Sequence, residues 1–233
     1  MMNEIMPYSD DIRQYFDRLA PEYETIINRL VPYYQKQNSL MMDLIPLERR
    51  AAFKALDLGA ATGILSRILL DTFPNATVKA VDISSVMLDL SKKKLWAYPN
   101  RASFQQVDFL TGDYGGGYDV VFAGLVLHHT DEAGRRTFFK RILSKMNAGG
   151  ILLCRDIVRG ATANLTQEYE KLWNLYMRAQ GEDSQLWSGK FQAKDPLSTV
   201  SDQQKWMRES GFIDVGCHWR YLNFALTGGR KPQ

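Results

Sequence analysis

The feature that most constrains this chain is an alternation of strand-like and helix-like segments between residues 53 and 154. Short apolar runs predict strands, and the longer stretches between them have helical spacing. This alternation is typical of a parallel sheet covered by helices on both faces, because parallel strands need crossover connections. The predicted strands are 53–58, 76–81, 102–107, 118–123 and 150–154, and the predicted helices are 64–70, 86–95 and 131–145.

Further segments flank this alternation. Residues 1–50 are expected to form an N-terminal helical lid, interrupted at Pro21 and again at Pro32. Residues 51–233 are expected to form the main domain, with a helical, aromatic insertion at 159–197 over the carboxyl edge of the sheet. The segments that complete the chain are a helix at 202–210 and two adjacent strands at 213–220 and 221–228. We therefore predict a doubly wound, seven-stranded α/β sheet with one antiparallel strand near the C-terminus.

Composition excludes several classes of protein. The 233 residues include 45% hydrophobic and 24% charged residues, which is ordinary for a globular protein and excludes a disordered or collagen-like chain. Lys and Arg exceed Asp and Glu by only three, too few for a dedicated nucleic-acid binder. Two cysteines cannot form a disulfide framework or a zinc site. No apolar run is long enough for a membrane span and no signal peptide opens the chain, so we expect a cytoplasmic protein.

The ends of the first three strands carry the strongest functional pattern. Ligands of open parallel sheets bind beyond the carboxyl ends of the strands. The first strand leads into a loop of small residues, 57–63, where a ligand can approach the backbone. Asp82 ends the second strand, where a ribose diol is usually bound, and Asp108 follows the third strand with Phe109 beside it. A small-residue loop and two acids in this order predict a site for an adenosine group.

The loop sequence narrows the choice of adenosine ligand. A dinucleotide fingerprint would need glycine where this chain has Ala61 and Ile64, so an NAD dehydrogenase remains only an outside alternative. A phosphate loop would need Lys and Ser or Thr after Gly63, which disfavours ATP. A cationic, phosphate-free ligand fits better, and Asp57 is placed to act through the loop on an α-amino group.

These motifs resemble the class I S-adenosylmethionine (SAM)-dependent methyltransferases. The resemblance covers residues 50–157, and its first motif is the run Asp57-Leu58-Gly59-Ala60-Ala61-Thr62-Gly63. Tyr118-Asp119-Val120-Val121 resembles the fourth strand, and 147–152 the turn into the fifth. Ala61 replaces the central glycine, which would cost about 1 kcal/mol if that position has positive φ.

The resemblance implies SAM as the cofactor on a Rossmann-like sheet. Asp82 would bind the ribose, Ile83 and Met87 would flank the adenine, and Asp108 would accept from its amine. The full set of expected cofactor-binding residues is Asp57, Gly59, Ala60, Ala61, Gly63, Asp82, Ile83, Met87, Asp108, Phe109, Gly124, Tyr15 and Tyr23. Tyr15, Phe16 and Tyr23 could place aromatic faces against the sulfonium, although a helix core stripe explains them equally well.

Four residues are candidates for the chemistry. His128 and His129 follow the fourth strand and have a side-chain type suited to a general base. Adjacent histidines are expected to point apart, so we predict no metal site. The fifth strand ends in Arg155 and Asp156, where buried charges suggest either contacts to polar groups of the substrate or a structural ion pair. Trp173, Trp187 and Phe191 either line the acceptor pocket or bury the insertion.

Missing motifs narrow the substrate. The fourth strand lacks the Asn/Asp-Pro-Pro-aromatic motif of base-amine methyltransferases, and the paired-glutamate loop of the protein-arginine branch is also missing. Phe16-Asp17 to Glu24 and Tyr221 to Arg230 resemble a small-molecule branch whose neighbours include the carboxy-SAM synthases. We therefore expect methylation of a small, aromatic or apolar metabolite, without a nucleic-acid or membrane partner. A carboxy-SAM-type or tRNA-directed enzyme, a non-catalytic SAM-binding module and a homodimer remain open.

Overall fold

The computed structural model describes residues 8–185, 187 and 197–233. Its strands are β1 (Lys54–Leu58), β2 (Thr77–Asp82), β3 (Ala102–Gln106), β4 (Tyr118–Gly124), β5 (Met146–Ile157), β6 (Ile213–Tyr221) and β7 (Phe224–Arg230). Its helices are α1 (Tyr8–Leu19), α2 (Tyr23–Leu30), α3 (Tyr34–Asp43), α4 (Ile64–Thr72), α5 (Ser85–Lys94), the 3₁₀ turn η1 (Leu127–His129), α6 (Glu132–Lys145), α7 (Ala163–Ala179) and α9 (Val200–Glu209).

The strands form one sheet in the order β3-β2-β1-β4-β5-β7-β6. β1 pairs in parallel with β2 and β4, and β7 is antiparallel to both of its neighbours. This confirms the predicted doubly wound sheet with one antiparallel strand. β5 is longer than expected because it pairs with β4 from Met146 and with β7 up to Ile157. Arg155 and Asp156 are therefore paired near the end of the strand, as the sequence indicated.

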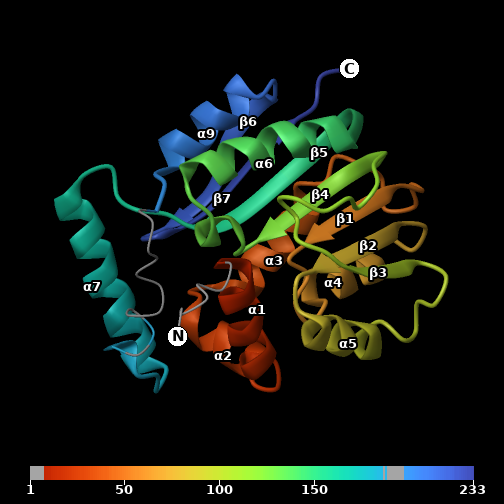
Figure 1. Ribbon diagram of the computed structural model, residues 1–233. Coiled ribbons are helices and arrows are strands. Elements are labelled where there is room, and N and C mark those ends of the chain that lie inside the picture. Colours follow the sequence, from red (N-terminus) through yellow and green to blue (C-terminus); the bar gives the residue numbers. More distant parts are fainter. Residues whose placement is uncertain (1–7, 186, 188–196) are drawn as a thin grey trace, which may run out of the picture.

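Helices cover both faces of the sheet (Figure 1). On one face, α6 and α9 bury Phe138, Phe139 and Met207 against the strands. On the other face, α4 contributes Leu65 and Leu69 to a second cluster. α3 joins this second cluster through residues such as Met41 and Met42. The third helix of the N-terminal segment is thus part of the sheet's own core, and only α1 and α2 can serve as a lid.

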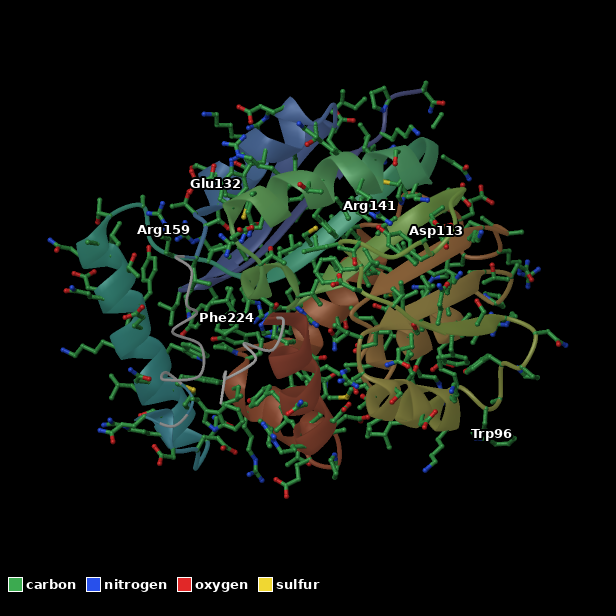
Figure 2. The ribbon with its side chains drawn as sticks, in the orientation of Figure 1. Trp96, Asp113, Glu132, Arg141, Arg159 and Phe224 are labelled. Atoms are coloured by element: carbon green, nitrogen blue, oxygen red, sulfur yellow. The ribbon has the colours of Figure 1, made fainter. Side chains whose placement is uncertain are left out.

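A third cluster lies at the carboxyl edge of the parallel strands, where Figure 1 shows α1 beside the arrowheads of β1 and β4. It joins α1 and α2 to α7 of the insertion. Trp173 of α7 donates its Nε1–H to the carbonyl of Leu30, 2.7 Å away, and its ring contacts Phe224 of β7. Figure 2 shows Phe224 where the sheet meets the N-terminal helices. These contacts attach the insertion beside the lid helices.

Two further sequence expectations can be compared with the structure. Within the described part of the chain, no helix combines the length and apolarity that crossing a membrane would require. Cys154 is buried in β5, where desolvation raises the pKa of its thiol well above the usual value. Cys154 is therefore a core residue without thiolate reactivity, as its position within a strand predicts.

Candidate functional site

A pocket of about 460 Å³ opens at the carboxyl ends of β1, β2, β3 and β4, beneath α1 and the start of α2. Its wall is mainly apolar, and none of its described lining residues is Lys or Arg. The volume lies within the range of about 300–1,000 Å³ typical of small-ligand sites. The predicted residues that line it are Gly59, Ala61, Asp82, Ile83, Met87, Asp108, Phe109, Gly124, Tyr23 and His129.

The remaining predicted residues lie around this pocket. Asp57, Ala60 and Arg155 line a small side cavity, which shares Gly59 and Gly124 with the main pocket. Four others line neither space: Gly63, Tyr15, His128 and Asp156. Gly63 instead begins α4 with φ +79°, where an added Cβ would lie 2.4 Å from the Ser91 hydroxyl.

The loop after β1 explains why small residues are required there. Gly59 has φ +64°, and an added Cβ would lie 2.1 Å from Cγ1 of Val126. Ala61 has φ +47°, a left-handed conformation that costs a non-glycine residue about 1–2 kcal/mol. Its backbone N–H donates to Oδ2 of Asp82 at 2.8 Å, which holds the strained residue in place. The loop is therefore packed against both β2 and the segment after β4.

Asp82 is the acid at the centre of the pocket wall. Its Oδ1 accepts from the backbone N–H of Ser84 at 2.9 Å, so both carboxylate oxygens are held by backbone donors. Burial raises the pKa of Asp82 to about 6, although these hydrogen bonds favour the ionised form. The fixed carboxylate faces the pocket as an acceptor for hydroxyl donors.

Asp57 has a different environment. It is 1% exposed, and its Oδ2 accepts from both the backbone N–H and the hydroxyl of Ser66. Burial raises the pKa of Asp57 to about 6 as well. Because Ser66 lies in the first turn of α4, this acid fixes the loop and helix that bound the site.

Asp108 and Phe109 lie at the opposite wall. Oδ1 of Asp108 accepts from the backbone N–H of Leu110 at 2.8 Å, which fixes the turn after β3. The Phe109 ring packs edge-on against Phe138 of α6, with centroids 5.8 Å apart. Ile83 and Met87 line the pocket as well, so a flat ring system would meet apolar side chains there.

Three titratable residues are brought together after β4. Nδ1 of His128 lies 2.6 Å from Oδ1 of Asp156, and both side chains are at least 95% buried. The His128 and His129 rings are 3.9 Å apart, so the histidines lie side by side rather than pointing apart as expected from the sequence. Within the described residues, no group of three or more potential metal ligands occurs.

His129 is the histidine that reaches the pocket. Its Nε2 is buried and has no hydrogen-bond partner among the described residues. Burial, and to a lesser degree the neighbouring His128, lower the pKa of His129 well below the usual value. Phe16 of α1 packs edge-on against its ring at 5.4 Å. The pocket thus contains a neutral imidazole at physiological pH.

The aromatic residues divide between the pocket and the core. Phe16 and Tyr23 line the pocket, whereas Tyr15 packs edge-on against Phe16. Trp173 and Trp187 are buried in the cluster around α7 and do not line the pocket, so they bury the insertion. Phe191 lies outside the described residues.

Sequence reasoning missed several residues of the site. Ile12, Leu110 and Val126 line the pocket, and Asn38 hydrogen-bonds to Arg155. Apolar spacing could have indicated Ile12 as part of a helical face. No local signal could have paired Asn38 with Arg155, because 117 residues separate them.

Comparisons with known proteins agree with this geometry. The sequence model of the family described as methyltransferase domain matches residues 55–150. A carboxy-S-adenosyl-L-methionine synthase from Campylobacter hominis is 24% identical, with 99% of this chain and 100% of the relative covered. A malonyl-[acyl-carrier protein] O-methyltransferase from Legionella pneumophila is 28% identical over 64% of this chain and 50% of the relative. The match to the methyltransferase domain and the similarity to these relatives support a class I SAM-dependent methyltransferase.

A solved structure has the same fold. Phosphoethanolamine N-methyltransferase 2 from Haemonchus contortus, in complex with S-adenosyl-L-methionine, superposes with a TM-score of 0.71 at 17% identity. The alignment covers 100% of this chain and 62% of that protein. The enzyme's cofactor is SAM, and the residues present fit such a ligand. The Gly59 loop permits close backbone approach, the pocket wall is largely apolar, and Asp82 supplies a fixed carboxylate.

Proposed function

We propose that the enzyme transfers a methyl group from SAM to a small, largely apolar metabolite that carries a protic nucleophile. The observation that carries this proposal is the neutral imidazole of His129, which lines an apolar pocket without a described Lys or Arg. SAM supplies an electrophilic methyl group on a sulfonium. The protein's contribution is to align the acceptor, exclude water and receive a proton.

In the proposed cofactor arrangement, the adenosine group lies across the ends of β2 and β3. Asp82 accepts from the ribose hydroxyls, and Ile83 and Phe109 pack against the adenine. Asp108 accepts from the adenine amine. The reactive end then points toward Gly124 and His129. This arrangement is supported by the pocket lining and by the orientation of both Asp82 oxygens.

His129 is the proposed proton acceptor. As the bond from the acceptor atom to the methyl carbon forms and the sulfur–carbon bond breaks, the acceptor's proton passes to Nε2 of His129. The products are the methylated acceptor and S-adenosylhomocysteine (SAH). Asp156 acts as a positioning residue, because its bond to Nδ1 fixes His128 against the His129 ring. α1 and α2 are proposed to exclude water as a lid.

The test begins by finding an acceptor through SAH release from SAM, a readout that does not require the product to be known. We would screen phenols, thiols, amines and carboxylic acids. With an acceptor identified, His129→Ala is expected to lower kcat about 10²- to 10⁴-fold. Its SAH affinity, measured by calorimetry, should change less than about threefold. Unchanged turnover in His129→Ala would exclude His129 as the base.

A carboxy-SAM synthase is the second candidate, favoured by the full-length similarity to the Campylobacter hominis protein. In that reaction the sulfonium methyl group would lose a proton and take up the CO2 released when a carboxylate-bearing donor breaks its carbon–carboxyl bond, and the donor would take up the proton. Methyl transfer remains our first proposal, because the main pocket has a largely apolar wall and presents a neutral imidazole, His129. Mass spectrometry of SAM after incubation with carboxylate metabolites separates the two: a derivative with an added carboxyl group, without SAH, would replace our first proposal.

A further inference from the structure

Arg155 is an unusual residue for the centre of a sheet. It lies in β5 beside Gly124 of β4 and Leu226 of β7, and it is only 2% exposed. Among the described residues, no carboxylate forms an ion pair with it. Burying a guanidinium without an anionic partner is unfavourable, because the charge loses its hydration. Asp57 lies near enough to interact with this charge but forms no ion pair with it, so the guanidinium remains available to a ligand.

The hydrogen-bond donors around Arg155 are only partly used. One Nη1–H donates to Oδ1 of Asn38 at 2.5 Å, and the guanidinium lies over the Tyr34 ring at 4.4 Å. Nε of Arg155 and Nδ2 of Asn38 are both buried, and neither has a hydrogen-bond partner in the part of the chain that the structure describes. Two buried donors that the protein leaves unsatisfied, one of them on a cation, suit a ligand that accepts hydrogen bonds and carries negative charge.

The position of these donors connects them to the pocket. Arg155 lines the small side cavity, which meets the main pocket at Gly59 and Gly124. A Cβ at Gly124 would lie 3.2 Å from Nη2 of Arg155 and 3.1 Å from Leu65, so glycine keeps this approach open. Asp57 lines the same cavity, which places an acid and a guanidinium on its walls.

We propose that Arg155, held by Asn38 and Tyr34, binds a carboxylate at the inner end of the pocket. A planar guanidinium matches a carboxylate in geometry, and Nη2 of Arg155 lies beside Gly124 at the edge of the main pocket, where the carboxylate would lie. The carboxylate can come from the amino-acid end of the cofactor or from the acceptor. This inference rests on the proposed placement of the cofactor, with its adenosine group at Asp82.

The test compares SAH with 5′-methylthioadenosine, which lacks the amino-acid end. By calorimetry, Arg155→Met is expected to weaken SAH binding about 10- to 100-fold and to leave methylthioadenosine binding unchanged. Asn38→Asp is the matched second variant, because it keeps the size of the side chain and places a competing anion beside Arg155. It should also weaken SAH selectively. Circular dichroism and thermal unfolding establish that each variant is folded.

The other outcomes are equally specific. If SAH affinity is unchanged but the SAH-loaded enzyme binds small carboxylic acids such as benzoate only when Arg155 is present, the carboxylate belongs to the acceptor. If neither SAH nor carboxylic acids distinguish the variants from the wild type, the inference is wrong. Asp82→Ala tests the proposed cofactor placement by itself, because it should weaken the binding of both SAH and methylthioadenosine. If it weakens neither, the cofactor placement is wrong, whatever the Arg155 variants show.

Discussion

At the scale of single residues, Asp82 should make cofactor affinity depend on pH. Burial raises the pKa of Asp82 to about 6 in the free enzyme, whereas ribose hydroxyls donate best to the ionised carboxylate. Below pH 6 the ligand must therefore displace a proton. We expect SAH affinity to fall about tenfold between pH 7 and pH 5, since each pH unit below the pKa corresponds to about 1.4 kcal/mol.

Calorimetry at pH 5, 6, 7 and 8 would measure this dependence, and buffers of different ionisation enthalpy would report proton release on binding. Asp82→Asn should bind weakly at every pH and release no proton. Asp57→Asn is the matched control for the second buried acid, because burial also raises the pKa of Asp57 to about 6. If the pH dependence persists in Asp82→Asn and disappears in Asp57→Asn, the titrating group is Asp57 and the prediction for Asp82 is wrong.

At the scale of elements, a hydrogen bond from Ser84 attaches α1 to the site. The Ser84 hydroxyl donates to Oδ1 of Asp17 at 2.5 Å and accepts from the backbone N–H of Met87 at the start of α5. Phe16, the residue before Asp17, lines the pocket. The bond therefore links the covering helix to the segment that follows Asp82.

We predict that Asp17→Ala speeds SAH dissociation about threefold to tenfold, because a hydrogen bond to a charged group contributes about 1.5–3 kcal/mol when buried and less when partly exposed. Stopped-flow fluorescence would measure both rate constants, and association should not become slower. Glu22→Ala is the control, because Glu22 is exposed and makes no side-chain capping bond. Equal dissociation rates in the two variants would mean that α1 does not retain the ligand.

The sequence predicts which helices and strands form better than it predicts where each helix packs. The order and type of strands and helices follow from local periodicity, so the sheet and its antiparallel strand could be predicted. The role of α3 could not, because a short amphipathic helix can cover a site or join a core, and Met41 and Met42 join the core. The loop acids could be placed at strand ends for the same topological reason.

The interior of the site depended on contacts distant in sequence. Nothing near Arg155 indicates that Asn38 holds it, and nothing near His128 indicates that Asp156 fixes its ring. Side-chain rotamers also decided which neighbour reaches the pocket: His129 does and His128 does not. Such choices follow from packing in three dimensions, which a single sequence does not encode in any local pattern.

At the scale of the whole molecule, buried titratable groups affect stability in opposite directions. Asp57 has a folded pKa of about 6 against an ordinary value of 3.8, so the folded state binds its proton more tightly than the unfolded state. This contribution makes the protein more stable as pH falls through 6. His129 acts in the opposite sense, because its lowered pKa means that the unfolded state binds the proton more tightly below pH 6.5.

Comparing variants separates these two effects. The stability of Asp57→Asn relative to the wild type should be greatest at pH 8 and should decline by about 1–2 kcal/mol by pH 5, where the wild-type acid is largely protonated. Asn keeps an oxygen acceptor for the backbone N–H of Ser66, which limits the structural change. For His129→Gln the relative stability should instead increase as pH falls, because the wild type alone must bury an unprotonated imidazole. Urea unfolding between pH 5 and pH 8 would measure both differences. If the stability of the wild type and of Asp57→Asn changes in parallel with pH, the pKa of Asp57 is not raised in the folded protein.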